Sequence, residues 1–168
     1  MDFTVETKVR MSTAGLRSLM RSLNEALNTV AVAGVINGDE DANEAAHLNE
    51  FGGTGIYKDG KYAGQTVSVP PRPFVASAID HHKNEVLKAG AEKIDFEKKP
   101  NFMKALDAMG KKAAELQKET ILTNGEGVPG WQKHNSPRTI ATKGFDDPLF
   151  TRHGETFPID YELVKVGK

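Results

Sequence analysis

One segment of the chain matches most of a phosphate-binding loop. Gly55 is followed after four residues by Gly60 and Lys61, the spacing in which backbone amides and a lysine hold nucleotide phosphates. That motif also needs a Ser or Thr after the lysine, for magnesium, and a helix that starts there. Here the next residue is Tyr62, and a strand-like stretch follows. Because Asp59–Gly60 is typical of a two-residue β-hairpin turn, we expect a hairpin and no nucleotide site.

The histidines and acids offer little for metal binding or catalysis. His47 and Glu50 are three residues apart and could share one helical face, as metal ligands do. No second pair has a useful spacing, and the adjacent His81 and His82 would diverge by about 100° on a helix. The chain has no cysteine and no Gly-x-Ser-x-Gly motif. We therefore expect no catalytic residue, no metal and no cofactor, and no enzymatic activity.

Composition narrows the class of protein further. The 168 residues are enough for one domain, residues 1–168, and need no disulfide or metal to fold. With 22 basic and 23 acidic residues the net charge is −1, which argues against DNA as the main partner. No apolar run approaches the length of a membrane span, and the first residues do not resemble a secretory signal.

Two turn-rich segments carry residues that favour interfaces. In the first, residues 69–74, Pro70 and Pro73 fix an extended backbone, so Arg72 should project away from the sheet while Phe74 anchors the next helix. The alternative is a rigid corner in which Arg72 caps carbonyl groups. In the second, residues 131–149, Trp131 lies in a polar loop, and Trp and Arg are common at interface hot spots. The alternative is that Trp131 covers the core.

The elements that must position these residues are read from periodicity. Alternation predicts strands at 2–10 and 159–166, a short β-branched run predicts one at 29–36, and the Asp59–Gly60 turn predicts a hairpin within 54–69. Helical spacing predicts helices after Ser12, at 42–50, from Phe74 and, capped by Asn101, at 102–121, with loops at 37–44 and 124–158. The helix after Ser12 carries the best apolar stripe of the chain, formed by Leu16, Leu19, Met20, Leu23 and Leu27. We expect an α+β fold: one antiparallel sheet of about four strands, packed on one face by two or three helices, with a long C-terminal loop.

The order of these motifs resembles the tail completion, or head–tail joining, family of long-tailed bacteriophages. That family reads His/Asn-Glu-Phe-Gly and, about twenty residues later, Ile-Pro-x-Arg-Pro-Phe at a helix start; this chain has residues 47–52 and 69–74. A Trp, Ser-Pro-x-Thr, Lys-Gly and Pro-Leu then precede the last strand, as at residues 131, 136–139, 143–144 and 148–149. The family often continues with Asp-Thr-Gly, whereas this chain separates Thr151 from Gly154.

The resemblance implies a structural virion protein of the phage neck, assembled in the host cytoplasm. Its partners would be copies of itself in a ring of six, a head-completion or portal-side protein, and a tail-tube or tail-terminator protein. Contact with DNA in the channel would not be sequence-specific, and no membrane is involved. The expected contact residues are Glu50, Phe51, Gly52, Pro70, Arg72, Pro73, Phe74, Trp131, Arg138, Thr139, Lys143, Pro148 and Leu149.

Two other functions stay open. The first is a tail-terminator ring of the same neck. The second, of a different class, is a small cytosolic nucleotide-binding or hydrolytic domain. That function would need either the Gly55–Lys61 loop or the pair of His47 and Glu50 to be active.

Overall fold

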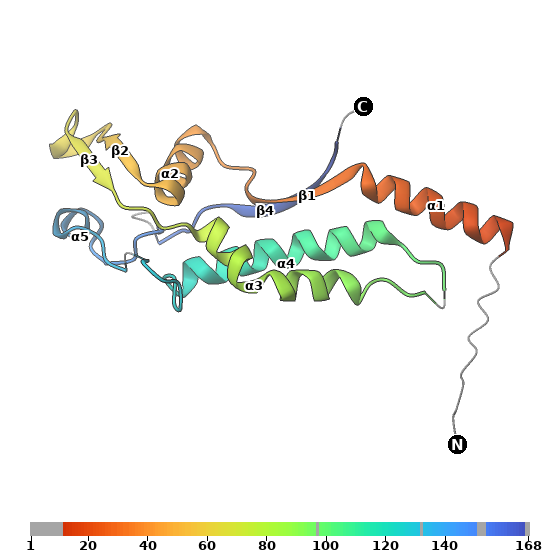
Figure 1. Cartoon of the computed structure of the whole chain (residues 1–168). Coiled ribbons are helices and arrows are strands. Elements are labelled where there is room, and N and C mark those ends of the chain that lie inside the picture. Colours follow the sequence, from red (N-terminus) through yellow and green to blue (C-terminus); the bar gives the residue numbers. More distant parts are fainter. Residues whose placement is uncertain (1–11, 97, 132, 151–153, 167–168) are drawn as a thin grey trace, which may run out of the picture.

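The computed structural model describes residues 12–96, 98–131, 133–150 and 154–166. The strand expected at residues 2–10 lies outside this part of the chain. The molecule is elongated, with α1 at one end and the hairpin of β2 and β3 at the other (Figure 1). The α+β class is confirmed: five helices accompany four strands, among the described residues.

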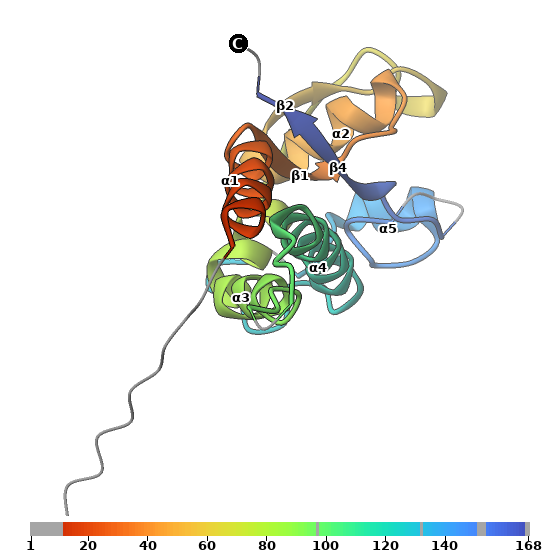
Figure 2. The same cartoon turned by 90° about the vertical axis from the view of Figure 1, so that its right-hand side faces the viewer.

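Two long helices form the base of the molecule. They are α3 (Phe74–Ala91) and α4 (Phe102–Leu122), and they lie side by side in both views (Figures 1 and 2). The Asn101 side chain caps α4, as its sequence predicts, by accepting a hydrogen bond of 3.1 Å from the Lys104 amide. Non-helical torsion angles at His82 (φ −118°, ψ 16°) kink α3.

A first two-stranded sheet lies on α4. It pairs β1 (Thr29–Val35) with β4 (Ile159–Lys165) antiparallel, with Val32 opposite Glu162. The sheet approaches α4 closely at Gly110, where a Cβ atom would lie 2.6 Å from the Tyr161 ring. Glycine at this position therefore sets the distance between the helix and the sheet.

A second two-stranded sheet is the hairpin of β2 (Gly53–Ile56) and β3 (Thr66–Val69). The expected hairpin is confirmed. The two-residue turn expected at Asp59–Gly60 is wrong, because the Tyr57 amide bonds to the Gln65 carbonyl and the longer connection between them contains a 3-10 turn, η1 (Gly60–Tyr62). The expectation of one four-stranded sheet is also wrong. The prolines after Val69 have no amide hydrogen, so β3 cannot be extended toward the other sheet.

The helix expected at 42–50 is confirmed but starts earlier, and a second helix lies where a loop was expected. The helix α2 (Glu40–Phe51) begins within the loop expected at 37–44, because Asp39 caps it through a 2.8 Å bond from the Ala42 amide. The helix α5 (Pro137–Lys143) lies inside the long loop expected at 124–158. Its signals are local: Ser136 is the cap, Pro137 is the first residue, and left-handed Gly144 ends it.

The helix α1 (Thr13–Leu27) forms where the sequence predicts, with Ser12 as its cap. It contacts the start of α4, where the Ser22 hydroxyl accepts a 3.2 Å bond from the Phe102 amide. None of its side chains is buried. Leu19 is half-buried, and Leu16, Met20, Leu23 and Leu27 are 36–71% exposed. The best apolar stripe of the sequence therefore does not face the core.

The core lies instead where α3, α4, β4 and the 131–149 segment meet. The Phe74 ring stacks on Phe157 with 5.5 Å between ring centroids. The buried cluster consists of Ala46, Phe74, Ala114, Ile121, Trp131, Leu149 and Ile159. No helix of the described residues is both long and apolar enough to span a membrane.

Candidate subunit-contact site

The three motif segments meet at the end of the molecule formed by α2, the start of α3 and α5. Glu50, from α2, is buried and accepts hydrogen bonds of 2.9 Å from the amides of Val75 and Ala76. Pro73 holds the cap position of α3 but makes no side-chain cap bond. The Glu50 carboxylate therefore replaces a local cap and carries the negative charge that a helix N-terminus favours.

Arg72 connects α2 to the 131–149 segment. Its side chain donates to the Asn49 side-chain oxygen (3.2 Å) and the His134 carbonyl (3.1 Å), and its own amide donates to the Asn49 carbonyl (2.5 Å). Only 4% of the residue is exposed, so the expectation that Arg72 projects outward is wrong. The alternative, a rigid corner with Arg72 on carbonyl groups, describes the arrangement. Burial lowers the pKa of the guanidinium, and the nearby Asp146 opposes this.

Trp131 covers the core, which was the second of the two interpretations considered for this residue. It is 7% exposed, and its indole N–H donates to the Asn124 side chain at 3.1 Å. Leu149, at the end of the segment, is 3% exposed and belongs to the same cluster. These two side chains anchor both ends of the segment to the core of the same chain.

Asp146 organises the middle of the segment. Its carboxylate accepts bonds from the Asn135 amide (2.6 Å) and the His134 ring (2.7 Å). The Asn135 bond first, then the His134 bond, hold the pKa of Asp146 below its ordinary value. Lys143 donates to the Asp147 carbonyl at 2.8 Å, and burial together with the charge of Arg72 lowers its pKa.

Arg138 attaches α5 to the β2–β3 hairpin. Its guanidinium carbon lies 3.3 Å from the centre of the Tyr62 ring and 4.8 Å from that of Tyr57. It also donates to the Gln65 side chain at 2.9 Å. Cation–π contacts of this kind join elements that share no backbone pairing.

An apolar hollow opens beside these contacts, between α2, the end of β1 and the start of α3. Phe51 stands at its rim with 70% of its surface exposed, and the His47 ring lies 4.9 Å from it, between centroids. The hollow measures about 280 Å³ and is lined by Val35, Asn43, Ala46, His47, Glu50, Phe51, Phe74 and Val75. We call it the α2–α3 hollow.

The expected contact residues thus differ in what they can offer a partner. Glu50, Arg72, Phe74, Trp131 and Leu149 are buried within the chain. Phe51 is exposed, and the remaining seven are half-buried: Gly52, Pro70, Pro73, Arg138, Thr139, Lys143 and Pro148. Contact between these residues and another subunit stays a prediction. The five buried residues would contribute only by holding the exposed residues in place.

Two surface features were not assigned to contacts from the sequence. One is the α2–α3 hollow, which joins His47, Glu50, Phe51 and Phe74 of the two motifs to residues of β1 and α2 outside them. The other is the apolar stripe of α1, whose spacing is visible in the sequence. Spacing shows that a helix has an apolar side and cannot show what covers that side.

The motifs considered for chemistry take other roles in the fold. Both oxygens of Glu50 are used on α3, and His47 packs on Phe51. No three His, Asp or Glu side chains of the described residues cluster as metal ligands would. Lys61 lies in η1, and the element after it is the strand β3, so the helix start that a phosphate loop requires is not at this position.

The chain matches no family model, no curated protein and no solved structure in the three comparisons made.

Proposed function

We propose that this chain is a non-enzymatic structural subunit of a phage neck, forming a ring that joins the tail to the head. The proposal starts from the motif order at residues 47–52, 69–74 and 131–149, which resembles the tail completion family. The motif order is the basis for the family and for the place in the virion. What the geometry adds is a role for the motif residues within one chain.

The observation that carries the proposal is that the three motif segments form one hydrogen-bonded unit. Glu50 of the first segment holds the helix that follows the second, and Arg72 of the second reaches His134, 62 residues away in the third. A hydrogen-bonded unit that presents the exposed Phe51 ring beside an apolar hollow supports a role in contact with other subunits.

A genetic experiment tests the place in the virion. The coding sequence is interrupted in the phage that carries it, and the particles are examined by negative-stain electron microscopy. We expect filled heads and separate tails of normal length, with joining restored when the chain is supplied in trans. Tails of abnormal length would instead indicate the terminator ring, and normal complete particles would overturn the proposal.

A melting assay tests the competing ligand-binding function. A nucleotide or metal at 100 times its dissociation constant would stabilise the fold by about 2.7 kcal/mol. ATP, GTP and zinc are each added to the purified chain, with Lys61→Ala as the matched variant for the nucleotides. We expect no shift with any of them. A shift with ATP that Lys61→Ala abolishes would favour the nucleotide-binding domain.

A further inference from the structure

The sheet of β1 and β4 has an open edge along β1. Among the described residues, β4 is the single strand neighbour of β1. The Asn28 carbonyl accepts a 2.9 Å bond from the Val166 amide, so the even-numbered residues of β1 pair with β4. The backbone groups of Ala31, Ala33 and Val35 therefore point away from β4, toward the open edge. A row of such groups is a template for a further strand.

A cavity of about 290 Å³ lies at this edge. It is bounded by β1, α3 and α4, with Ala33, Ile79 and Ala113 among its apolar lining, and no residue of β4 lines it. Gln117, which is 1% exposed, also lines the cavity and donates to the Ala33 carbonyl at 3.2 Å. The side-chain oxygen of Gln117 is buried without a hydrogen-bond partner among the described residues. An amide of an added strand would supply the missing donor.

The two sides of β1 set what such a strand must look like. Ala31 lies on the side of the helices, where a Cβ atom at Gly110 would be 3.2 Å from its own Cβ. Val30 and Val32 lie on the other side and are 46% and 41% exposed. A neighbouring strand would therefore need one apolar side, over the cavity, and one side toward solvent.

Residues 2–10 have this pattern in the sequence. Phe3, Val5, Thr7 and Val9 alternate with Asp2, Thr4, Glu6 and Lys8. A third strand would also suit the sheet, because two strands alone are marginal.

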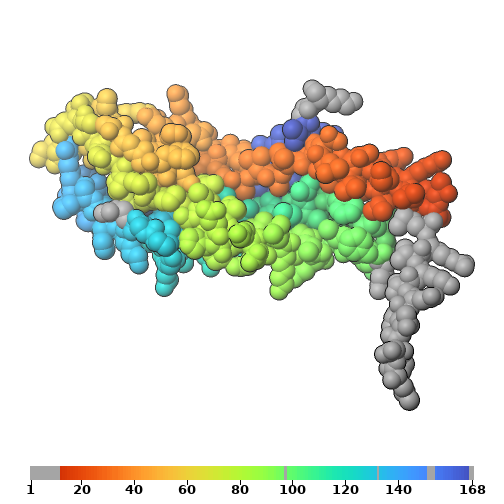
Figure 3. Space-filling model, viewed as in Figure 1, coloured from red at the N-terminus to blue at the C-terminus, as the bar shows by residue number. Residues whose placement is uncertain are grey.

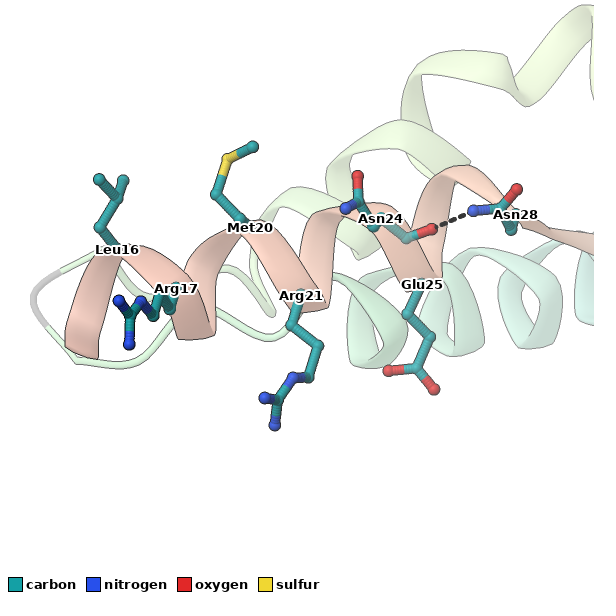
Figure 4. Close-up of a pocket in the computed structure, with 7 residues that line it drawn as sticks. All are labelled: Leu16, Arg17, Met20, Arg21, Asn24, Glu25 and Asn28. Atoms are coloured by element: carbon teal, nitrogen blue, oxygen red, sulfur yellow. Dashed lines mark hydrogen bonds between the residues drawn. The ribbon is translucent and has the colours of Figure 1, made fainter. Parts of the chain in front are cut away.

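Distance decides which copy can supply this segment. The helix α1 separates Ser12 from Thr29 by about 25 Å, at 1.5 Å per residue. Figure 4 shows α1 unbroken from Leu16 to Asn28, and Figure 3 shows it at one end of the molecule. An extended chain covers about 3.3 Å per residue, so a return from Ser12 to Thr29 takes about eight residues. Only residues 2 and 3 of the segment would then remain to pair along β1 of the same copy.

We infer that residues 2–10 of one copy add as a strand to the open edge of β1 in another copy. Backbone pairing supplies the affinity, and the apolar side chains over the cavity fix which side of the strand faces the helices. The contact joins two different surfaces, so its repetition closes into a ring or extends. The inference rests on the proposed function for the ring, and it adds the two segments through which copies join.

Cross-linking tests the pairing, because the chain has no cysteine and single thiols can be introduced. Glu6→Cys marks the middle of the segment on its polar side, and Val32→Cys marks the middle of β1 on its exposed side. The middles of two paired strands meet whether the strands run parallel or antiparallel. Glu162→Cys is the matched control, since Glu162 is exposed and lies opposite Val32 on β4, one strand farther from the edge.

Equal mixtures of two full-length variants are treated with a short bis-maleimide, and a tag on one partner identifies mixed dimers on a denaturing gel. We expect Glu6→Cys to give mixed dimers with Val32→Cys and several-fold fewer with Glu162→Cys. A chain that carries both Glu6→Cys and Val32→Cys should give dimers and longer chains. Equal yields with the two partners, a preference for Glu162→Cys, or a double variant that closes only within itself would overturn the inference.

Sedimentation velocity gives a second measurement. Val5→Asp places a charge on the apolar side of the segment, and Thr4→Asp places the same charge on its polar side. We expect the parent and Thr4→Asp to form oligomers and Val5→Asp to stay monomeric, with circular dichroism as the check on folding. A parent that is monomeric at every concentration, or equal assembly of the two variants, would contradict the pairing.

The phage experiment fails independently of these two. Separate heads and tails from the interrupted phage, without mixed dimers from the purified chain, would remove only this contact. Mixed dimers together with normal particles from the interrupted phage would remove only the neck function.

Discussion

The carboxylate of Glu50 accepts a 2.9 Å hydrogen bond from the amide of Val75, 25 residues along the chain. The start of α3 is thereby capped by a side chain from α2 in place of one from its own turn. The contact also orders the chain between the two helices, since the hairpin of β2 and β3 begins and ends beside it.

Glu50→Ala should therefore destabilise the fold. It leaves the amides of Val75 and Ala76 without the carboxylate, and loss of a charged cap costs about 2 kcal/mol. Glu50→Gln keeps one acceptor oxygen and should lose less. Urea unfolding followed by circular dichroism compares the two, and equal stability of Glu50→Ala and the parent would contradict the cap.

Arg72→Ala should cost more than a surface substitution. The side chain is buried, so its loss leaves the Asn49 side chain and the His134 carbonyl without their donor, at a cost of about 2–4 kcal/mol. Arg72→Lys keeps the charge but not the two-pronged geometry and should recover only part of this. Thermal melting of both variants is the measurement. An unchanged melting temperature in Arg72→Ala would show that Arg72 does not stabilise the fold.

Arg138→Ala should loosen α5 without unfolding the chain. The guanidinium is held between Tyr57 and Tyr62, and such contacts contribute about 1 kcal/mol. Hydrogen exchange should quicken at the amides of Ile140 and Gly144, which bond within α5 and at its end. The amides in the middle of α4 are the internal control, and faster exchange there as well would mean that Arg138 supports the whole fold.

Acid should act on the segment through Asp146. The pKa of this carboxyl is lower in the folded chain than its ordinary value of 3.8, so ionised Asp146 stabilises the fold above that pH. The stabilisation is lost as the pH falls from about 4 through the lowered pKa. Asp146→Asn should therefore be less stable than the parent at pH 6, and the difference should shrink toward pH 2. Melting across this range tests it, and a difference independent of pH would exclude the carboxylate's charge as the cause.

Gly125→Ala should be more damaging than Gly127→Ala. Both glycines have left-handed torsion angles (φ +66° and +79°), which cost a side chain about 1–2 kcal/mol. A Cβ atom at Gly125 would also lie 2.0 Å from the Trp131 ring, whereas none at Gly127 would meet an atom within 4 Å. The fluorescence of Trp131, the single tryptophan, should change in the first variant alone. Equal melting temperatures would contradict the close packing.

Local signals in the sequence determined most of the helices and strands. Asn101 and Ser12 cap helices where they were expected to, and the β-branched run at 29–36 and the alternation at 159–166 mark strands that the structure confirms. These features depend on residues a few positions apart, whose preferences are visible without knowledge of the fold. The helix α5 also has local signals, the Ser136 cap and Pro137 at its first position. It was not predicted because it is short and the Gly, Pro, Asn and Asp residues around it favour a loop.

Tertiary structure alone decided how these elements combine. It split the strands into two sheets, buried Glu50 and Arg72, and left Leu16, Met20 and Leu27 of α1 exposed. Each outcome depends on groups far apart in the sequence, such as the His134 carbonyl that receives Arg72. A side chain's type and spacing fix which face of an element is apolar or charged. What meets that face is set by the packing of the whole chain, because burial is a property of the neighbours and not of the residue.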